Sequence, residues 1–304
     1  MKNRWWTYQK ERFPIFAHGP LVIVFCTSVM LFSALQQKPA EMPELMQIGG
    51  AVISTLILFF QLRVADEFKD FETDARYRPH RAVPRGLVTL PELARLAFIG
   101  AIIQFAIAIR FDVGLVPFLV GIWLYVGLMT KEFFAPEWLR SHPVAYLLSH
   151  MLIMPLIAFY ISAFDWLCTC KVMPSGLGWL LALSFFCGLV LEIGRKIKAP
   201  AKERTGVETY SGLWGPTHSA AIWLACIAAA GLAYVNALPY ITAVADYAIV
   251  AIVLPAVALL TAMPLVMSKY KLEPSADVAI EPASGLVALT LYLCLGPAQF
   301  LMGQ

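Results

Sequence analysis

Residues 45–87 read LMQIGGAVISTLILFFQLRVADEFKDFETDARYRPHRAVPRGL, and this stretch decides the fold class. Its first half, 45–65, is almost free of charge and has the length of about 20 residues that an α-helix needs to cross a bilayer core of roughly 30 Å. Its second half, 66–87, crowds acidic and basic side chains together. The stretch therefore predicts a transmembrane helix that ends in a charged loop.

The same apolar pattern recurs along the whole chain. Hydrophobic residues make up 60% of the 304 residues and charged residues only 14%, and the mean hydropathy is +0.71. In soluble domains about a quarter of the residues are charged. We therefore expect an all-α, multi-pass membrane bundle of nine transmembrane helices in a single domain over 1–304. The nine apolar blocks lie at about 16–35, 45–65, 93–110, 114–130, 143–164, 175–193, 216–236, 240–267 and 283–302.

The distribution of Lys and Arg predicts the orientation, because cytoplasmic loops of membrane proteins are enriched in these residues. With the N-terminus inside, all but three of the 23 Lys and Arg residues fall on the inner side; the exceptions are Lys38, Arg110 and Lys171. We therefore expect the N-terminus in the cytoplasm and the C-terminus on the opposite side. The net charge of +3 follows from this topology and calls for no nucleic acid partner. The loops expected in the cytoplasm are 66–90, 131–142, 194–215 and 268–281.

Three aspartates at the inner end of the second apolar block are spaced four residues apart. Asp66, Asp70 and Asp74 would share one face of a helix, and Glu67 adds a fourth carboxylate. Like charges at this spacing repel one another, and charge near hydrocarbon is costly, so the group favours a bound cation. Mg²⁺ is held in proteins by carboxylates and phosphate oxygens. The segment therefore predicts a magnesium site, with a solvated loop that binds nothing as the alternative.

The same segment resembles the first aspartate-rich motif of the UbiA superfamily of intramembrane prenyltransferases. That motif reads Asn-Asp-x-x-Asp-x-x-x-Asp and is followed by Arg-Pro-x-Pro-x-Gly. Asp66 falls at the family's Asn, Glu67 at the next Asp, and Asp70 and Asp74 at the later two. Residues 81–86, Arg-Ala-Val-Pro-Arg-Gly, match the second part with alanine in place of the first proline. The resemblance implies helices around one apolar cavity, with Asp66, Asp70 and Asp74 as catalytic residues on the cytoplasmic side.

The family's second motif, Asp-x-x-x-Asp, is expected at the inner end of the sixth apolar block, where this chain departs from it. Glu192 stands at the first Asp, but Lys196 stands at the second. The next acids are Glu203 and Glu208, and we assign Glu203 together with Glu192 to a second metal site. The predicted metal ligands are then Asp66, Glu67, Asp70, Asp74, Glu192 and Glu203.

Basic side chains near both motifs are candidates for binding a diphosphate. Arg81 follows the first motif, and Lys131 resembles a family lysine that contacts the diphosphate. Arg195 and Lys196 would supply positive charge that a second metal otherwise provides. The alternative for each of these side chains is anchoring of a helix end among the lipid headgroups.

The resemblance implies Mg²⁺-dependent transfer of a prenyl group from a prenyl diphosphate to a lipophilic, aromatic acceptor in the bilayer. The altered second motif leaves open a terpene cyclase, in which the allylic cation is attacked by its own chain. A non-catalytic lipid-binding or transport protein is a third possibility, although the density of carboxylates at the membrane edge weighs against it. The sequence contains no phosphate-cradling glycine loop and no nucleophile elbow, so it does not support a nucleotide-dependent enzyme or a hydrolase.

Overall fold

The chain folds into helices that form two compact units. The computed structural model describes residues 3–37, 40–199, 202–203, 206–241, 257 and 276–302. Every secondary-structure element in these ranges is a helix, which confirms the all-α prediction. Unit 1 comprises Met1–Cys26 and Pro43–Met173, and unit 2 comprises Thr27–Met42 and Pro174–Gln304. The expectation of a single domain over the whole chain stays a prediction.

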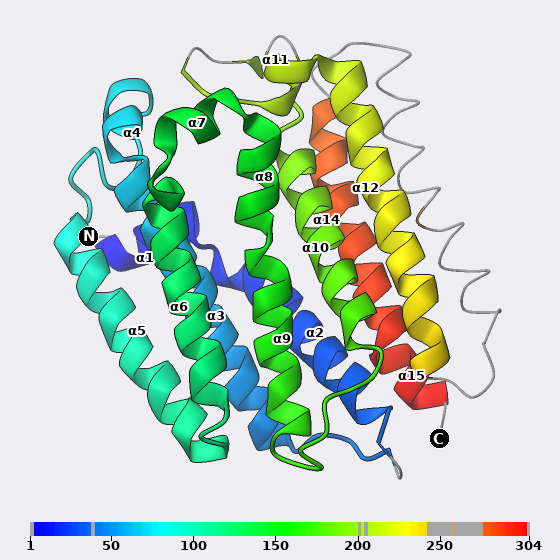
Figure 1. Cartoon of the computed structure of the whole chain (residues 1–304). Coiled ribbons are helices and arrows are strands. Elements are labelled where there is room, and N and C mark those ends of the chain that lie inside the picture. The colour runs from blue at the N-terminus through cyan, green and yellow to red at the C-terminus, as the bar shows by residue number, and fades with distance from the viewer. Residues whose placement is uncertain are drawn as a thin grey trace. The chain divides into compact units, whose positions relative to one another are not determined.

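Unit 1 contains the helices that precede residue 174. Figure 1 shows α3, α5 and α6 side by side, and α9 packs against α6 and α3. The elements of unit 1 are α1 (Arg4–Arg12), the first part of α2 (Ile15–Ala34), α3 (Leu45–Lys69), α4 (Phe71–Tyr77), α5 (Leu90–Phe111), α6 (Leu115–Thr130), the short turn η1 (Glu132–Phe134), α7 (Pro136–Ser141), α8 (Pro143–Met151) and α9 (Ile153–Trp166).

Unit 2 is built around α10, α12 and α14, which pack against one another (Figure 1). Trp223 on α12 donates its indole N–H to Ser284 Oγ on α14 over 3.0 Å, and Tyr292 on α14 donates to Ser184 Oγ on α10 over 2.9 Å. The elements of unit 2 are the last part of α2, α10 (Leu177–Arg195), α11 (Tyr210–Trp214), α12 (Pro216–Ala237), η3 (Leu238–Tyr240), α14 (Ala276–Leu295) and α15 (Pro297–Met302).

The chain is a multi-pass integral membrane protein. Within the described residues six helical segments are long and apolar enough to cross a bilayer, and two shorter apolar helices accompany them. The six are Leu45–Lys69, Leu90–Phe111, Pro143–Trp166, Leu177–Arg195, Pro216–Tyr240 and Ala279–Met302, and the shorter two are His18–Ala34 and Leu115–Thr130. Eight of the predicted blocks thus coincide with apolar helices. The remaining block, 240–267, lies almost entirely outside the described residues, so the count of nine stays a prediction.

The predicted block 143–164 is not one straight helix. It consists of α8 and α9, which meet at Leu152. Pro155 explains the break, because a proline has no N–H for the carbonyl four residues earlier and its ring crowds that carbonyl. Such breaks are tolerated in membrane helices where neighbouring groups satisfy the freed backbone atoms.

The interior of unit 1 is joined by hydrogen bonds between helices. Gln104 on α5 is fully buried, donates to the backbone oxygen of Ser54 on α3 over 2.9 Å and accepts from the Trp123 indole on α6 over 3.3 Å. The Ser54 hydroxyl also pairs with the Tyr160 hydroxyl on α9 at 2.9 Å. In hydrocarbon, polar side chains of this kind link helices because no water is present there as an alternative hydrogen-bond partner. These bonds fix α3, whose end carries the acidic motif.

Helix α1 and the loop after α4 pack together beside the end of α3. Tyr8 on α1 is buried in a cluster with Val64 of α3 and with Ala82 and Val83 of the loop. Gly86 closes this loop with a φ of +76°, a conformation that glycine adopts without a steric penalty. Gly86, the glycine of the second half of the motif, therefore allows the turn to form. The apolar residues Ala82 and Val83 anchor the loop.

Candidate functional site

The backbone keeps the four-residue register of the acidic segment although the helix does not run through it. Helix α3 ends at Lys69 and α4 begins at Phe71, with Asp70 between them. The Asp70 N–H nevertheless bonds to the Asp66 oxygen, and the Asp74 N–H to the Asp70 oxygen, both over 2.8 Å. The aspartates therefore still follow one another by about one helical turn.

Two of the four predicted metal ligands in this segment are buried against arginines. The Glu67 side chain is 1% exposed, and Arg12 Nε lies 2.5 Å from its Oε1. The Asp74 side chain is 2% exposed and is bound by Arg81 Nη1 at 2.6 Å and Arg78 Nη1 at 3.0 Å, with Arg12 Nη2 at 4.0 Å. A buried carboxylate needs a compensating charge, and these arginines supply it. Arg12 was not expected from the sequence, because it lies 55 residues before Glu67 in a different helix.

The other two predicted ligands, Asp66 and Asp70, are less completely paired. The Asp66 side chain is half exposed and meets Arg63 at 3.3 Å. No hydrogen bond or ion pair to the Asp70 carboxylate occurs within the described residues. Burial and the negative charge of Asp66 raise the pKa of Asp70, and Lys69 opposes this only in part. A cation placed between the two aspartates would relieve this repulsion.

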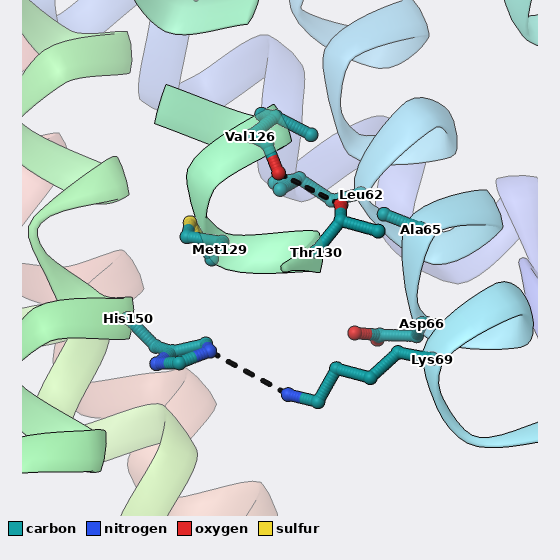
Figure 2. A pocket seen from close by; sticks show the side chains of 8 residues that line it. All are labelled: Leu62, Ala65, Asp66, Lys69, Val126, Met129, Thr130 and His150. Carbon is teal, nitrogen blue, oxygen red and sulfur yellow. Dashed lines mark hydrogen bonds between the residues drawn. The ribbon is translucent and has the colours of Figure 1, made fainter. Parts of the chain in front are cut away.

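A small cavity lies beside Asp66 (Figure 2). Its volume is about 20 Å³, which is enough for roughly one water molecule. A drug-sized ligand needs a pocket of about 300 Å³ or more, so this cavity alone does not hold a prenyl diphosphate. Its lining comes from α3, α6 and α8 and consists of Leu62, Ala65, Asp66, Lys69, Val126, Met129, Thr130 and His150.

Lys69 makes polar contacts that the sequence did not reveal. Figure 2 shows its ammonium directed at His150, with Nζ 3.5 Å from Nε2. The same ammonium donates to the Tyr146 hydroxyl and lies 3.5 Å from Glu132 Oε1. The only sequence signal was the position of Lys69 inside the acidic motif, directly before Asp70.

The predicted magnesium ligands fit an ion only in part. Within the described ranges no group of three or more His, Cys, Asp and Glu side chains converges on one point. Mg²⁺ is, however, commonly bound by one or two carboxylates and completed by water and substrate phosphates. Asp70 and the half-exposed Asp66 suit that arrangement, whereas Glu67 and Asp74 are buried against arginines.

The second predicted metal site lies in unit 2, where both carboxylates already have protein partners. Glu192 pairs with Arg195 Nε at 2.6 Å and with Lys196 Nζ at 3.0 Å. Glu203 accepts hydrogen bonds from the hydroxyls of Thr209 and Ser211, each over 2.7 Å. The residues predicted to clamp a diphosphate, Arg195 and Lys196, therefore neutralise Glu192, and Glu203 fastens the loop to the start of α11.

Two predicted phosphate ligands of unit 1 differ in their surroundings. Arg81 is engaged by Asp74, as described above. Lys131 follows α6 directly and is exposed, and its side chain makes no ion pair or hydrogen bond in the part of the chain that the structure describes. Lys131 is therefore the predicted phosphate ligand that is available without breaking an existing contact.

Solved structures of similar architecture support the fold. Neither a protein-family profile nor a curated protein sequence matches the chain. A UbiA homolog from Aeropyrum pernix K1 matches 94% of this chain and 98% of its own, with a TM-score of 0.67 and 15% identity. A digeranylgeranylglyceryl phosphate synthase matches 96% and 97%, with a TM-score of 0.62 and 12% identity. The chain therefore has the fold of UbiA-superfamily proteins over nearly its whole length.

Proposed function

We propose that the chain is a Mg²⁺-dependent intramembrane prenyltransferase that moves a prenyl group from a prenyl diphosphate to a lipophilic, aromatic acceptor. The observation that carries the proposal is the Asp70 carboxylate, which has no hydrogen bond or ion pair among the described residues and lies directly after a transmembrane helix, one turn from the half-exposed Asp66. The fold shared with a UbiA homolog and with a digeranylgeranylglyceryl phosphate synthase supports it. A passive lipid binder has no use for such charge at the edge of the hydrocarbon.

Different residues of unit 1 would bind Mg²⁺ and the diphosphate. Asp66 and Asp70 would hold Mg²⁺, which when bound helps to neutralise the departing diphosphate. Lys131 would bind diphosphate oxygens directly, because its ammonium has no protein partner among the described residues. Glu67 and Asp74, held by arginines, would keep the acidic segment in place.

In unit 2 we assign the larger role in diphosphate binding to basic side chains rather than to a second metal ion. Arg195 and Lys196 lie beside Glu192 at the end of α10, where their side chains would bind diphosphate oxygens. A second magnesium ion at Glu192 and Glu203 would have to displace these ion pairs and hydrogen bonds. The proposal therefore places the main metal requirement on Asp66 and Asp70.

The reaction would break the bond between the first prenyl carbon and the diphosphate oxygen, whose electron pair leaves with the diphosphate. The acceptor then bonds to the prenyl carbon and loses a proton. Incubating the purified protein with a panel of prenyl diphosphates and aromatic acceptors, with Mg²⁺ or with a chelator, tests the proposal by mass spectrometry of lipid extracts. A prenylated acceptor that forms only with Mg²⁺ supports it. A cyclic product without acceptor would instead indicate a terpene cyclase, and lipid binding without diphosphate release a non-catalytic protein.

The proposed orientation places the acidic segment in the cytoplasm with the N-terminus. An engineered cysteine at Glu203, introduced after the six native cysteines have been replaced, is expected to react with a membrane-impermeant reagent only from the cytoplasmic side. Labelling from the external side alone would contradict this orientation.

A further inference from the structure

The turn that follows α6 has an unusual backbone. Glu132, Phe133 and Phe134 have φ values of +48°, +52° and +59° in succession. Left-handed conformation costs a residue with a Cβ about 1–2 kcal/mol, so three in a row persist only where surrounding contacts hold them. Lys131, the predicted diphosphate ligand, directly precedes this turn and is joined to it, because the Phe134 N–H donates to the Lys131 backbone oxygen over 3.0 Å.

The contacts that hold the turn converge on Lys69. Its ammonium has three hydrogens, and three acceptors surround it: the Tyr146 hydroxyl, Glu132 Oε1 and His150 Nε2. The Lys69 and Glu132 side chains are only 15% and 21% exposed, so the ion pair between them is largely shielded from water. We call these four residues the Lys69 cluster; its members are Lys69, Glu132, Tyr146 and His150.

The aromatic rings complete the Lys69 cluster. His150 Nδ1 lies 2.8 Å from the Tyr146 backbone oxygen, which accepts only, so Nδ1 carries the hydrogen and Nε2 turns its lone pair to Lys69. The Tyr146 and His150 rings stack at 3.9 Å. Phe133, in the middle of the turn, packs edge-on against His150 at 5.8 Å and against Tyr125 at 5.6 Å. The turn is thus held by charge at Glu132 and by packing at Phe133.

The Lys69 cluster also connects the turn to the acidic motif. Lys69 lies between Asp66 and Asp70 in sequence, and Asp66 lines the same cavity as Thr130, the last residue of α6. We propose that the Lys69 cluster is a positioning device, which holds the left-handed turn and so fixes Lys131 with respect to Asp66 and Asp70 for diphosphate binding. This inference rests on the proposed function, since it assigns the diphosphate to that site.

The test measures binding of inorganic pyrophosphate with Mg²⁺ by calorimetry on the full chain in detergent. Lys69→Met and Glu132→Gln are each expected to weaken binding by about 2-fold to 30-fold, the range for mutations within a coupled network. The double variant should bind pyrophosphate no more weakly than the single variant with the lower affinity, because both substitutions act through the same turn. Glu132→Asp, which keeps the charge, should recover part of the affinity. Lys10→Met removes an exposed positive charge elsewhere in unit 1 and should bind like the wild type.

The Glu132→Gln result separates positioning from direct contact. If Lys69 itself bound the diphosphate, loss of Glu132 would free its ammonium and tighten binding, which would overturn the inference. Lower melting temperatures with unchanged pyrophosphate affinity in Lys69→Met and Glu132→Gln would overturn it as well. A wild-type protein that binds no pyrophosphate with Mg²⁺ would instead contradict the proposed function, and with it the role that the inference gives to Lys131.

The strain in the turn can be tested at Phe134, whose side chain is 78% exposed. Phe134→Ala and Phe134→Gly remove the same ring, but only glycine relieves the backbone. The glycine variant should melt about 2–4 °C higher than the alanine variant. It should also bind pyrophosphate at least as tightly as the alanine variant, because the left-handed turn that positions Lys131 is then free of the Cβ penalty. Weaker binding by the glycine variant would show that the left-handed turn does not position Lys131.

Discussion

The acidic segments of unit 1 and unit 2 differ in the partners of their carboxylates. In unit 1, Glu67 and Asp74 are buried against arginines, while Asp66 is half exposed beside Arg63 and Asp70 has no ion pair or hydrogen bond among the described residues. In unit 2, Glu192 is paired with two cations of its own helix end, and Glu203 accepts hydrogen bonds from hydroxyl groups. A carboxylate without a protein partner favours a metal ion, whereas a carboxylate already paired with two cations does not. We therefore expect unit 1 to determine the response to Mg²⁺, and substitutions at the basic residues of unit 2 to affect the affinity for diphosphate.

The largest effect is expected at Asp70. Asp70→Asn keeps the shape of the side chain but removes the charge that would attract Mg²⁺, so turnover should fall on the order of 100-fold or more and lose its stimulation by Mg²⁺. A Mg²⁺ titration of the transfer rate measures both effects. Glu72→Gln, an exposed acid of α4, is the matched control and should behave like the wild type. Normal Mg²⁺ stimulation in Asp70→Asn would remove the distinction between the two segments.

The next effect concerns stability and the buried half of the first segment. Arg12→Ala leaves Glu67 buried without a counterion, which typically costs about 3–5 kcal/mol. Chemical unfolding in detergent measures it, with Arg4→Ala as the control because the exposed pair of Arg4 with Glu92 is worth about 1 kcal/mol or less. Replacing Arg12 and Glu67 together with methionine should restore most of the loss. If Arg12→Ala were no more destabilising than Arg4→Ala, the arginines would not be the compensating charge.

A smaller effect is expected at Lys196 in unit 2. Lys196→Ala should weaken pyrophosphate binding about ten-fold, as expected for one charge-assisted contact. Lys196→Asp places a carboxylate four residues after Glu192 and should raise the Mg²⁺ requirement, making unit 2 resemble unit 1. Calorimetry at several Mg²⁺ concentrations measures both the pyrophosphate affinity and its dependence on Mg²⁺. Unchanged affinity and an unchanged Mg²⁺ titration in Arg195→Ala, Lys196→Ala and Lys198→Ala alike would show that these residues only anchor the helix end.

The smallest effect is expected at Glu203. Glu203→Gln retains one oxygen that accepts from Thr209 or Ser211, so the loss of stability should be about 1 kcal/mol. The Mg²⁺ titration should not change, because the proposal gives this carboxylate a fastening role. A clear rise in the Mg²⁺ concentration needed for half-maximal activity would place Glu203 among the metal ligands and would make the two segments alike.

The helices could be predicted from sequence because hydrophobicity and length act locally. Thr89 with Glu92 marks the start of α5 by a capping box, and apolar blocks of sufficient length give the spans. The break at Leu152 was not predicted, although Pro155 was visible, because prolines are often accommodated in membrane helices. Only the surrounding packing decides whether such a helix bends or divides.

The spacing of the acidic residues predicted their backbone register correctly, but spacing does not determine which carboxylate is already paired. Asp66 and Asp74 have similar positions in the pattern, yet one is half exposed and the other meets three arginines. Arg12 belongs to a helix far away in sequence, and no local rule connects it to Glu67. The Lys69 cluster was missed for the same reason, since Lys69 and His150 are 81 residues apart. Long-range ion pairs depend on tertiary packing, which the sequence pattern does not show.

The pairing of Arg12 with Glu67 has a consequence for synthesis of the chain. Because translation proceeds from the N-terminus, Arg12 leaves the ribosome before Glu67 and Asp74 do. The guanidinium is therefore already present in the chain when Glu67 is made, whereas the two nearer partners of Asp74 are made after it. Arg78 and Arg81 follow only a few residues after Asp74. The order of the chain thus limits the time during which these acids stand at the bilayer edge with their charge exposed.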